Sequence, residues 1–124
     1  YLYARPGETG DDPDLPRGVY WTVLQADGSY GSLDFAGYNV SPAGSTTFSP
    51  ELLGDGTQMI VTRAGISEEE EAELGQRGFY LHHQTDSGWD DGTLLPLPYG
   101  WDATLLPDDQ LLYVNGGDLY VISL

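Results

Sequence analysis

Acidic side chains dominate the groups in this sequence that could do chemistry. Asp86, Asp90 and Asp91 follow one another closely in a segment that also contains Gly88 and Gly92. Calcium takes about six to eight oxygen ligands, mainly from carboxylates and carbonyls. These three aspartates are therefore the candidate metal ligands, and calcium is the one cofactor that the sequence suggests. The segment does not have the spacing of an EF-hand loop.

Groups for catalysis are few. His82 and His83 are adjacent in a segment with strand character, and neighbouring residues of a strand point to opposite faces. We therefore expect one imidazole to be buried and hydrogen-bonded and the other to be exposed. The chain has no cysteine and no serine in a Gly-x-Ser-x-Gly turn. Adjacent aspartates such as Asp108 and Asp109 are typical of turns. The sequence predicts a protein without catalytic activity of its own.

Two tryptophans are the candidate binding residues. Trp89 and Trp101 both lie in segments rich in glycine and other turn-forming residues. An exposed indole often anchors a partner in an interface. The alternative is that both rings cover the edges of sheets. Together with the acidic loops they could also bind a carbohydrate.

The composition limits the classes of function. The 124 residues include 20 acidic residues against four arginines, which gives a net charge of −16. A chain this acidic is unsuited to nucleic acid and to anionic lipid. No apolar run reaches the roughly 20 residues of a membrane span. A content of 40% hydrophobic residues suffices for the core of one domain. Because salt screens self-repulsion, we expect an extracytoplasmic location (periplasmic, envelope or extracellular).

The chain alternates between strand-forming and turn-forming segments. Stretches rich in valine, isoleucine, tyrosine and tryptophan are separated by clusters of glycine, proline, aspartate and serine. One short helix is predicted from Ser67, a candidate N-cap, to Gly75, a candidate stop. Strands are predicted over residues 2–5, 19–25, 32–35, 46–49, 58–63, 79–84, 93–95, 103–106, 111–115 and 119–124.

A strand–connector–strand pattern occurs three times. The second strand of each copy carries a tyrosine near its start, at Tyr20, Tyr80 and Tyr120. We expect these tyrosines to lie in three separate sheets and to pack between them. Upstream of two copies, the segments 47–50 and 104–107 each end in proline before a turn, and we align them as strands that stop at that proline. The repeating unit is thus four short antiparallel strands over about 40–60 residues, which is the content of a β-propeller blade.

These repeats resemble those of the TolB-like β-propeller family. That family places a Phe-Ser-Pro-Asp-Gly turn before its second strand and an Asp-Ile-Tyr-Val sequence in its third. The corresponding segments here are Phe48-Ser49-Pro50, Leu106-Pro107-Asp108-Asp109 and Asp118-Leu119-Tyr120-Val121-Ile122. Glu51-Leu52-Leu53 departs from the family pattern, as does Asp109 where glycine is usual. The resemblance implies propeller packing and protein–protein binding. Related propellers also gate access to serine peptidases of the prolyl oligopeptidase type.

The expected fold is all-β, with antiparallel four-stranded propeller blades in an incomplete ring. Residues 1–124 form a single unit with a partial blade over 1–45, a full blade over 46–99 and a partial blade over 100–124. A closed propeller needs at least about four blades. We therefore expect other protein chains, or missing blades of the same protein, to complete the ring. The alternative fold is a compact β-sandwich.

The expected function is a non-catalytic interaction or scaffolding module. Two alternatives remain open at this point. One is the gating domain of a prolyl-oligopeptidase-type serine peptidase, and the other is a carbohydrate-binding module.

Overall fold

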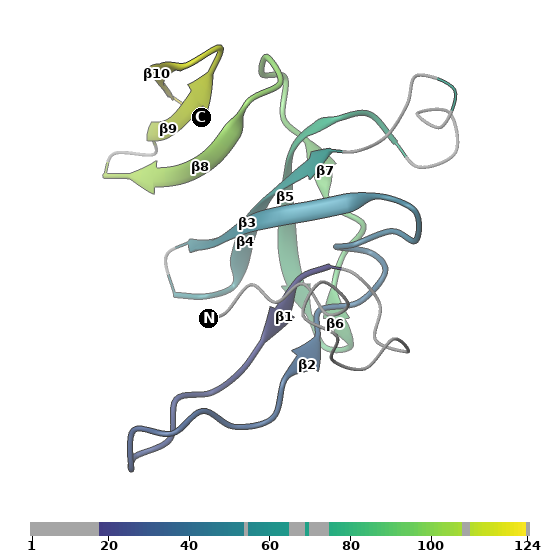
Figure 1. Cartoon of the computed structure of the whole chain (residues 1–124), viewed down its shortest axis with the longest axis vertical. Helices are drawn as coiled ribbons and strands as arrows, with labels where there is room; N and C mark the ends of the chain where they lie inside the picture. The colour runs from purple at the N-terminus through teal and green to yellow at the C-terminus, as the bar shows by residue number, and fades with distance from the viewer. Residues whose placement is uncertain (1–17, 54, 65–68, 70–74, 108–109, 124) are drawn as a thin grey trace.

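The computed structural model describes residues 18–53, 55–64, 69, 75–107 and 110–123, and these residues form antiparallel sheets without a helix (Figure 1). The first sheet, the central sheet and the last sheet follow one another along the chain. The first sheet contains β1 (Tyr20–Trp21) and β2 (Asp34–Phe35). The central sheet contains β3 (Thr46–Leu53), β4 (Gln58–Ala64), β5 (Gly78–Thr85), β6 (Gly88–Trp89) and β7 (Thr93–Leu94). The last sheet contains β8 (Trp101–Leu106), β9 (Gln110–Asn115) and β10 (Asp118–Ser123).

Most of the predicted strands within the described residues are present, with shifted ends. The predicted strand over 19–25 is shorter, because regular pairing stops after Trp21 and only the bridge from Leu24 to Tyr30 follows. The short strand β6 was not predicted. The predicted strand at 2–5 and most of the predicted helix from Ser67 to Gly75 lie outside the described residues. No described helix is long and apolar enough to cross a membrane.

The prediction that the strand beginning at Thr46 stops at Pro50 is wrong. Strand β3 continues to Leu53, with a register shift between Phe48 and Glu51. Proline cannot donate a ladder hydrogen bond, but a bulge leaves one residue unpaired and so accommodates it. Strand β8, by contrast, does end before Pro107.

The pairing registers of the central and last sheets match, and the short first sheet is paired in the same way around its tyrosine. Tyr80 pairs with Val61 in the central sheet, and Tyr120 pairs with Tyr113 in the last. On the other edge of β5, Tyr80 pairs with Leu94 of β7. Tyr20 of β1 pairs in the same way with Phe35 of β2. The three tyrosines therefore occupy equivalent positions in three different sheets, as the repeats predict. The prediction that all three pack between sheets is wrong for Tyr120, which is 44% exposed because β10 lies at the edge of the last sheet. We call two residues equivalent when they occupy the same position in the strand pairing of their respective sheets.

Strands β3 and β8, the first strands of the central and last sheets, lie beside each other, and equivalent residues of the two strands are in contact. Phe48 of β3 stacks on Trp101 of β8, with ring centroids 5.8 Å apart. Ser49 donates a hydrogen bond to Asp102, 53 residues further on, and both residues have a positive φ at the register shifts of their strands. Thr104 donates to Oε1 of Glu51 over 2.7 Å, again with a spacing of 53 residues. The alignment of 47–50 with 104–107 is therefore corrected: Phe48 is equivalent to Trp101.

The central sheet is buried on both faces, as alternation along its strands requires. Ile60 and Phe79 pack toward the last sheet, in a cluster with Leu111 and Tyr113. Val61 and Tyr80 point the other way, in a cluster with Val19 near the first sheet. The described chain is thus an open series of three sheets, an incomplete ring, rather than a two-sheet sandwich.

Candidate functional site

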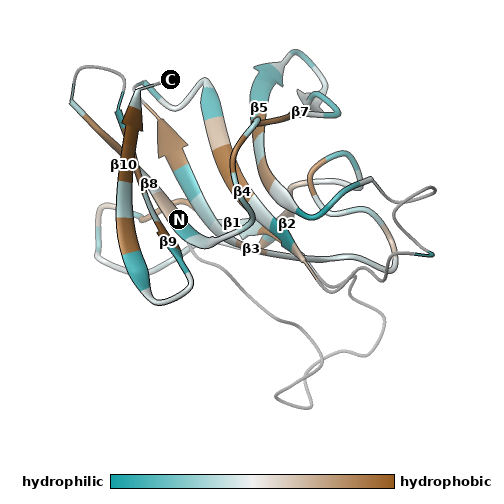
Figure 2. Ribbon diagram, turned by 90° about the horizontal axis from the view of Figure 1, so that it is seen from above, coloured by the Kyte–Doolittle hydropathy of each residue, from teal (hydrophilic) through white to brown (hydrophobic). Residues whose placement is uncertain are grey.

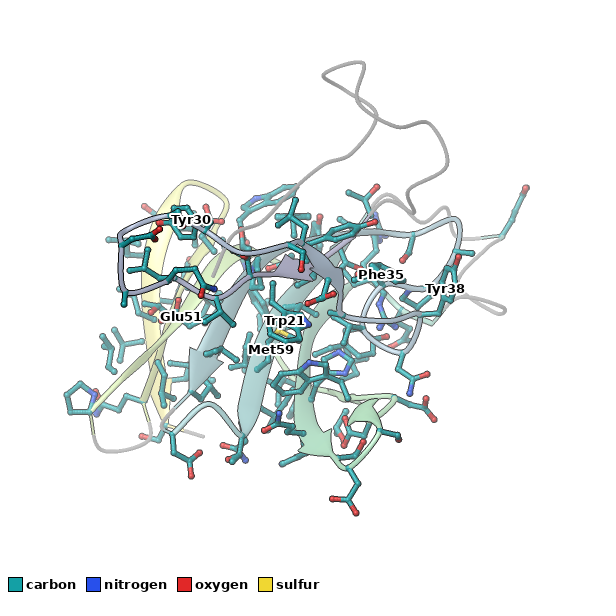
Figure 3. All side chains as sticks on the ribbon, turned by 90° about the horizontal axis from the view of Figure 1, so that it is seen from below. Trp21, Tyr30, Phe35, Tyr38, Glu51 and Met59 are labelled. Carbon is teal, nitrogen blue, oxygen red and sulfur yellow. The ribbon has the colours of Figure 1, made fainter. Side chains whose placement is uncertain are left out.

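A cavity of about 610 Å³ lies between the first sheet and the central sheet. We call it the indole cavity, because Trp21 and Trp89 both line it. Leu52 and Met59 contribute apolar surface, and Figure 3 shows Trp21 together with Met59. This volume falls within the range of about 300–1,000 Å³ that is usual for small-molecule sites.

Two pairs of strand neighbours place the polar groups of the indole cavity. Trp21 pairs with Asp34 across β1 and β2. Trp89 pairs with Gln84 across β6 and β5. Residues directly opposite each other on antiparallel strands share one face, with Cβ atoms about 5 Å apart. Each sheet therefore presents one indole beside one polar side chain to the cavity.

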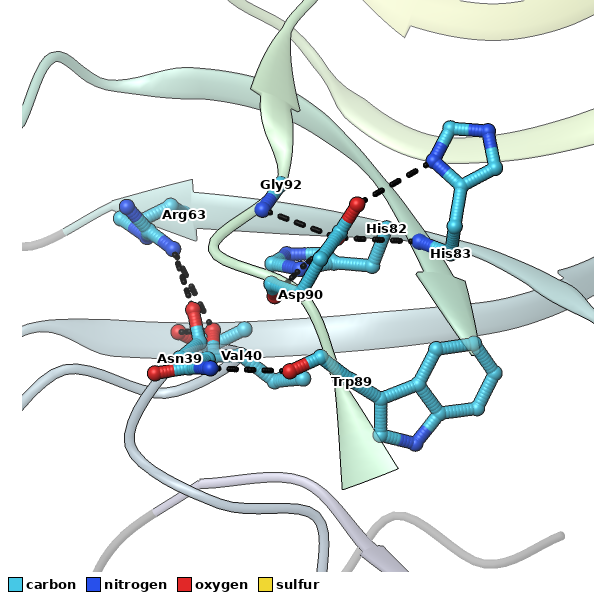
Figure 4. Close-up of polar contacts among 9 residues, drawn as sticks. Asn39, Val40, Arg63, His82, His83, Trp89, Asp90 and Gly92 are labelled. Carbon is cyan, nitrogen blue, oxygen red and sulfur yellow. Dashed lines mark hydrogen bonds and ion pairs between the residues drawn. The ribbon is translucent and has the colours of Figure 1, made fainter. Parts of the chain in front are cut away.

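The connection from β2 to β3 is fastened to the central sheet by a buried arginine. Arg63 is only 4% exposed, and its Nη2 donates to the carbonyls of Asn39 and Val40 over 3.3 and 3.4 Å. Its guanidinium lies 3.8 Å from the centroid of the Tyr80 ring. Burial lowers the pKa of Arg63, and Tyr80 opposes this shift. Asn39 in turn donates to the carbonyl of Trp89 over 2.8 Å, which joins this network to one wall of the cavity (Figure 4).

The two histidines of β5 behave as alternation predicts: His82 is fully buried and His83 is exposed. Nδ1 of His82 lies 2.9 Å from the carbonyl oxygen of Asp90 (Figure 4). A carbonyl only accepts, so this nitrogen carries a hydrogen. In the neutral ring Nε2 is then a buried acceptor, and it has no hydrogen-bond partner in the structure. Burial lowers the pKa of His82, the bond to the Asp90 carbonyl opposes the shift, and Arg63 adds to it.

Glycine at position 92 lets the turn close on His82. Gly92 has a φ of 74°, and a Cβ there would overlap the imidazole of His82. Its N–H donates to Oδ1 of Asp90 over 3.0 Å, and the N–H of His83 donates to the same oxygen over 3.0 Å. Desolvation raises the pKa of Asp90, but these bonds outweigh it and hold that pKa below its usual value.

The three candidate calcium ligands have different environments. The carboxylate of Asp90 accepts hydrogen bonds from its own turn, while Asp86 and Asp91 are exposed. Among the described residues, no group of three acidic or histidine side chains is placed to hold a metal ion. The calcium site stays a prediction.

The two candidate tryptophans lie in different places. Trp89 lines the indole cavity, whereas Trp101 stacks on Phe48 and meets Tyr99 edge-on, with ring centroids 5.1 Å apart. Trp21 and Asp34 were missed as site residues. No local signal in the sequence marks this pair, because Trp21 and Asp34 are brought together by the pairing of β1 with β2.

A second candidate surface is the outer face of the last sheet. It carries Leu112, Val114, Leu119 and Val121, because these residues pair with one another across β9 and β10. Leu119 is 70% exposed and Val121 is 52% exposed. Figure 2 shows β10 at the margin of the molecule, with hydrophobic residues along it. We call this surface the open face.

Comparisons with protein families, with curated proteins and with solved structures find no match to this chain.

Proposed function

We propose that the chain is a non-catalytic protein-binding module, a segment of a TolB-like β-propeller whose open face packs against a further blade contributed by other polypeptide. The open face has an equivalent in the central sheet: Val114 and Leu119 pair as Thr62 and Phe79 do. Thr62 and Phe79 are fully buried beneath the last sheet. The same kind of surface is thus covered in one sheet and bare in the next.

The equivalent face also indicates what kind of partner fits. Phe79 meets the ring of Tyr113 from the last sheet edge-on, at 5.4 Å between centroids. The cover of the central sheet is therefore an antiparallel sheet with large apolar side chains on its inner face. A partner with the same architecture supplies that cover for Leu119 and Val121.

The edge of β10 supports the same proposal. Strand β5, its equivalent, is flanked on one side by β4 and on the other by β6 and β7. Among the described residues, β10 pairs only with β9. Its other edge offers unpaired N–H and C=O groups, which favour addition of a strand. The partner is expected to add this strand as well as to cover the open face.

Sedimentation velocity of the purified chain tests the proposal. With no partner present, the exposed apolar surface favours self-association, so the mean mass should rise with protein concentration. Leu119→Asp places a charge at the centre of the open face and should return the chain to a monomer. Ser32→Asp adds the same charge at an exposed position in the β1–β2 connection and should leave association unchanged.

A result against the proposal is equally concrete. If the unaltered chain is a folded monomer at all concentrations, with a melting temperature independent of concentration, the open face needs no cover. If Leu119→Asp and Ser32→Asp reduce association equally, repulsion between acidic chains explains the effect and the open face is not the interface.

A further inference from the structure

The indole cavity is not used by the proposed interaction. It lies on the opposite side of the central sheet from the last sheet, because Met59 and Val61 face the first sheet while Ile60 faces the last. Its described lining holds two indoles, the rings of Tyr20 and Phe35, aliphatic side chains and the polar side chains of Asp34, Gln84 and Ser87. Its ligand must therefore be argued from this lining alone.

Charge is the first guide to the ligand. Asp34 is the one charged side chain among the described residues of the lining. No described arginine or histidine is placed to neutralise an anion there. The chain as a whole carries a net charge of −16, and such a field concentrates cations near the surface. A cationic group is the charge that this cavity complements.

The aromatic rings point to the same class of ligand. A cation over the face of a tryptophan ring is attracted by the ring quadrupole, and tryptophan is the strongest partner among the aromatic residues. Trp21 stands directly beside Asp34 across the first sheet, and it remains 39% exposed. An ammonium group at this position would meet an indole and a carboxylate together.

We propose that the indole cavity binds an organic cation with an apolar body, such as a quaternary or methylated amine. The ammonium group is held by Asp34 and Trp21. The apolar body lies against Leu52, Met59 and the second indole, Trp89. A cavity of about 610 Å³ holds much more than a bare ammonium group, so the apolar body is part of the recognised ligand.

The test uses the three tryptophan side chains as separate reporters. In ¹⁵N-labelled protein each indole N–H gives its own NMR signal, and Trp101 lies outside the cavity against Phe48. Titration with benzyltrimethylammonium in low-salt buffer should shift the signals of Trp21 and Trp89 and leave that of Trp101 in place. Choline should bind at least about threefold more tightly than 3,3-dimethylbutan-1-ol, which has the same shape without the charge.

Two variants separate the local carboxylate from the overall charge. Asp34→Asn should weaken binding of benzyltrimethylammonium by about three- to tenfold. Asp118→Asn removes the same charge from the exposed first residue of β10 and should change binding by less than about twofold. Asp34 is exposed, so its substitution should leave the fold intact, as the unshifted signals of the remaining backbone will show.

Four outcomes would overturn the proposal. The first is that neither Trp21 nor Trp89 responds to the cations. The second is that the neutral alcohol binds as tightly as choline. The third is that both aspartate variants weaken binding equally. The fourth is that cellobiose shifts the same two signals at lower concentration than either cation, which would make the cavity a carbohydrate site.

Discussion

The central sheet and the last sheet have the same strand register but opposite environments. Phe79 is fully buried, and its equivalent Leu119 is 70% exposed. Both side chains are large and apolar, so residue type does not explain the difference. The central sheet has a neighbour on that face and the last sheet has none among the described residues. Burial at this repeated position is therefore decided by the next sheet and not by the strand itself.

The largest expected effect comes from truncating the same position in the two sheets. Phe79→Ala should lower the free energy of unfolding by about 3–5 kcal/mol, because it leaves a cavity between two packed sheets. Leu119→Ala should change it by no more than about 0.5 kcal/mol, because the side chain is exposed in the monomer. Urea unfolding of dilute protein, followed by tryptophan fluorescence, measures both values. Equal losses in the two variants would show that the open face is already covered.

A smaller effect is expected where the two sheets contact each other. Thr104→Val removes the hydrogen bond to Glu51 and should cost about 0.5–1.5 kcal/mol. Glu51→Gln keeps an acceptor oxygen in the same place and should cost less. Thermal unfolding of both variants and of the double variant gives the coupling between the two residues. If Thr104→Val has no effect in the Glu51→Gln background and a full effect alone, the bond depends on the carboxylate charge.

The smallest effect is expected from a change of pH. It arises at a position where the central sheet has a histidine and the last sheet has an isoleucine. His82 pairs with Met59 as Ile122 pairs with Leu111, so only the central sheet has a titratable group there. The pKa of His82 is lowered by burial, so the unfolded chain binds a proton first as pH falls. The neutral, buried His82 therefore contributes to the free energy of unfolding. This contribution is fully present above the unfolded pKa of about 6.5 and is lost as pH falls from there toward the folded pKa.

Measuring the free energy of unfolding from about pH 7.5 to about pH 5.5 tests this loss. The free energy of unfolding should fall across that window in the unaltered chain. His82→Asn keeps an N–H for the Asp90 carbonyl without a titratable ring, and the slope should become smaller. His83→Asn serves as the exposed control and should keep the original slope. An unchanged slope in His82→Asn would assign the pH dependence to other groups.

Several parts of the fold could be predicted because they depend on local patterns. Alternation predicted that one of His82 and His83 is buried and the other exposed, and the structure shows that His82 is the buried one. The recurrence of Tyr20, Tyr80 and Tyr120 predicted three equivalent strands. Trp89 lines the indole cavity, and its role as a binding residue stays a prediction. These results need only the two-residue period of a strand and the repetition of a unit.

Other features depend on register, which the local pattern leaves open. Pro50 lies within a bulged strand rather than at its end, so aligning the two prolines gave the wrong equivalence. The pairing of Trp21 with Asp34 depends on how the long connection between β1 and β2 closes. A shift of one strand by one residue would move its side chain to the other face and separate Trp21 from Asp34.

The sequence by itself determined the all-β class, the antiparallel repeat and the acidic character, because propensity, alternation and charge are properties of the chain. Only the tertiary structure decided which face of each sheet is covered and where a cavity remains between sheets. The physical reason is that burial and cavities arise between elements far apart in sequence, where packing depends on the shape of the neighbouring sheet. Equivalent residues such as Phe79 and Leu119 can therefore share a pattern and differ completely in exposure.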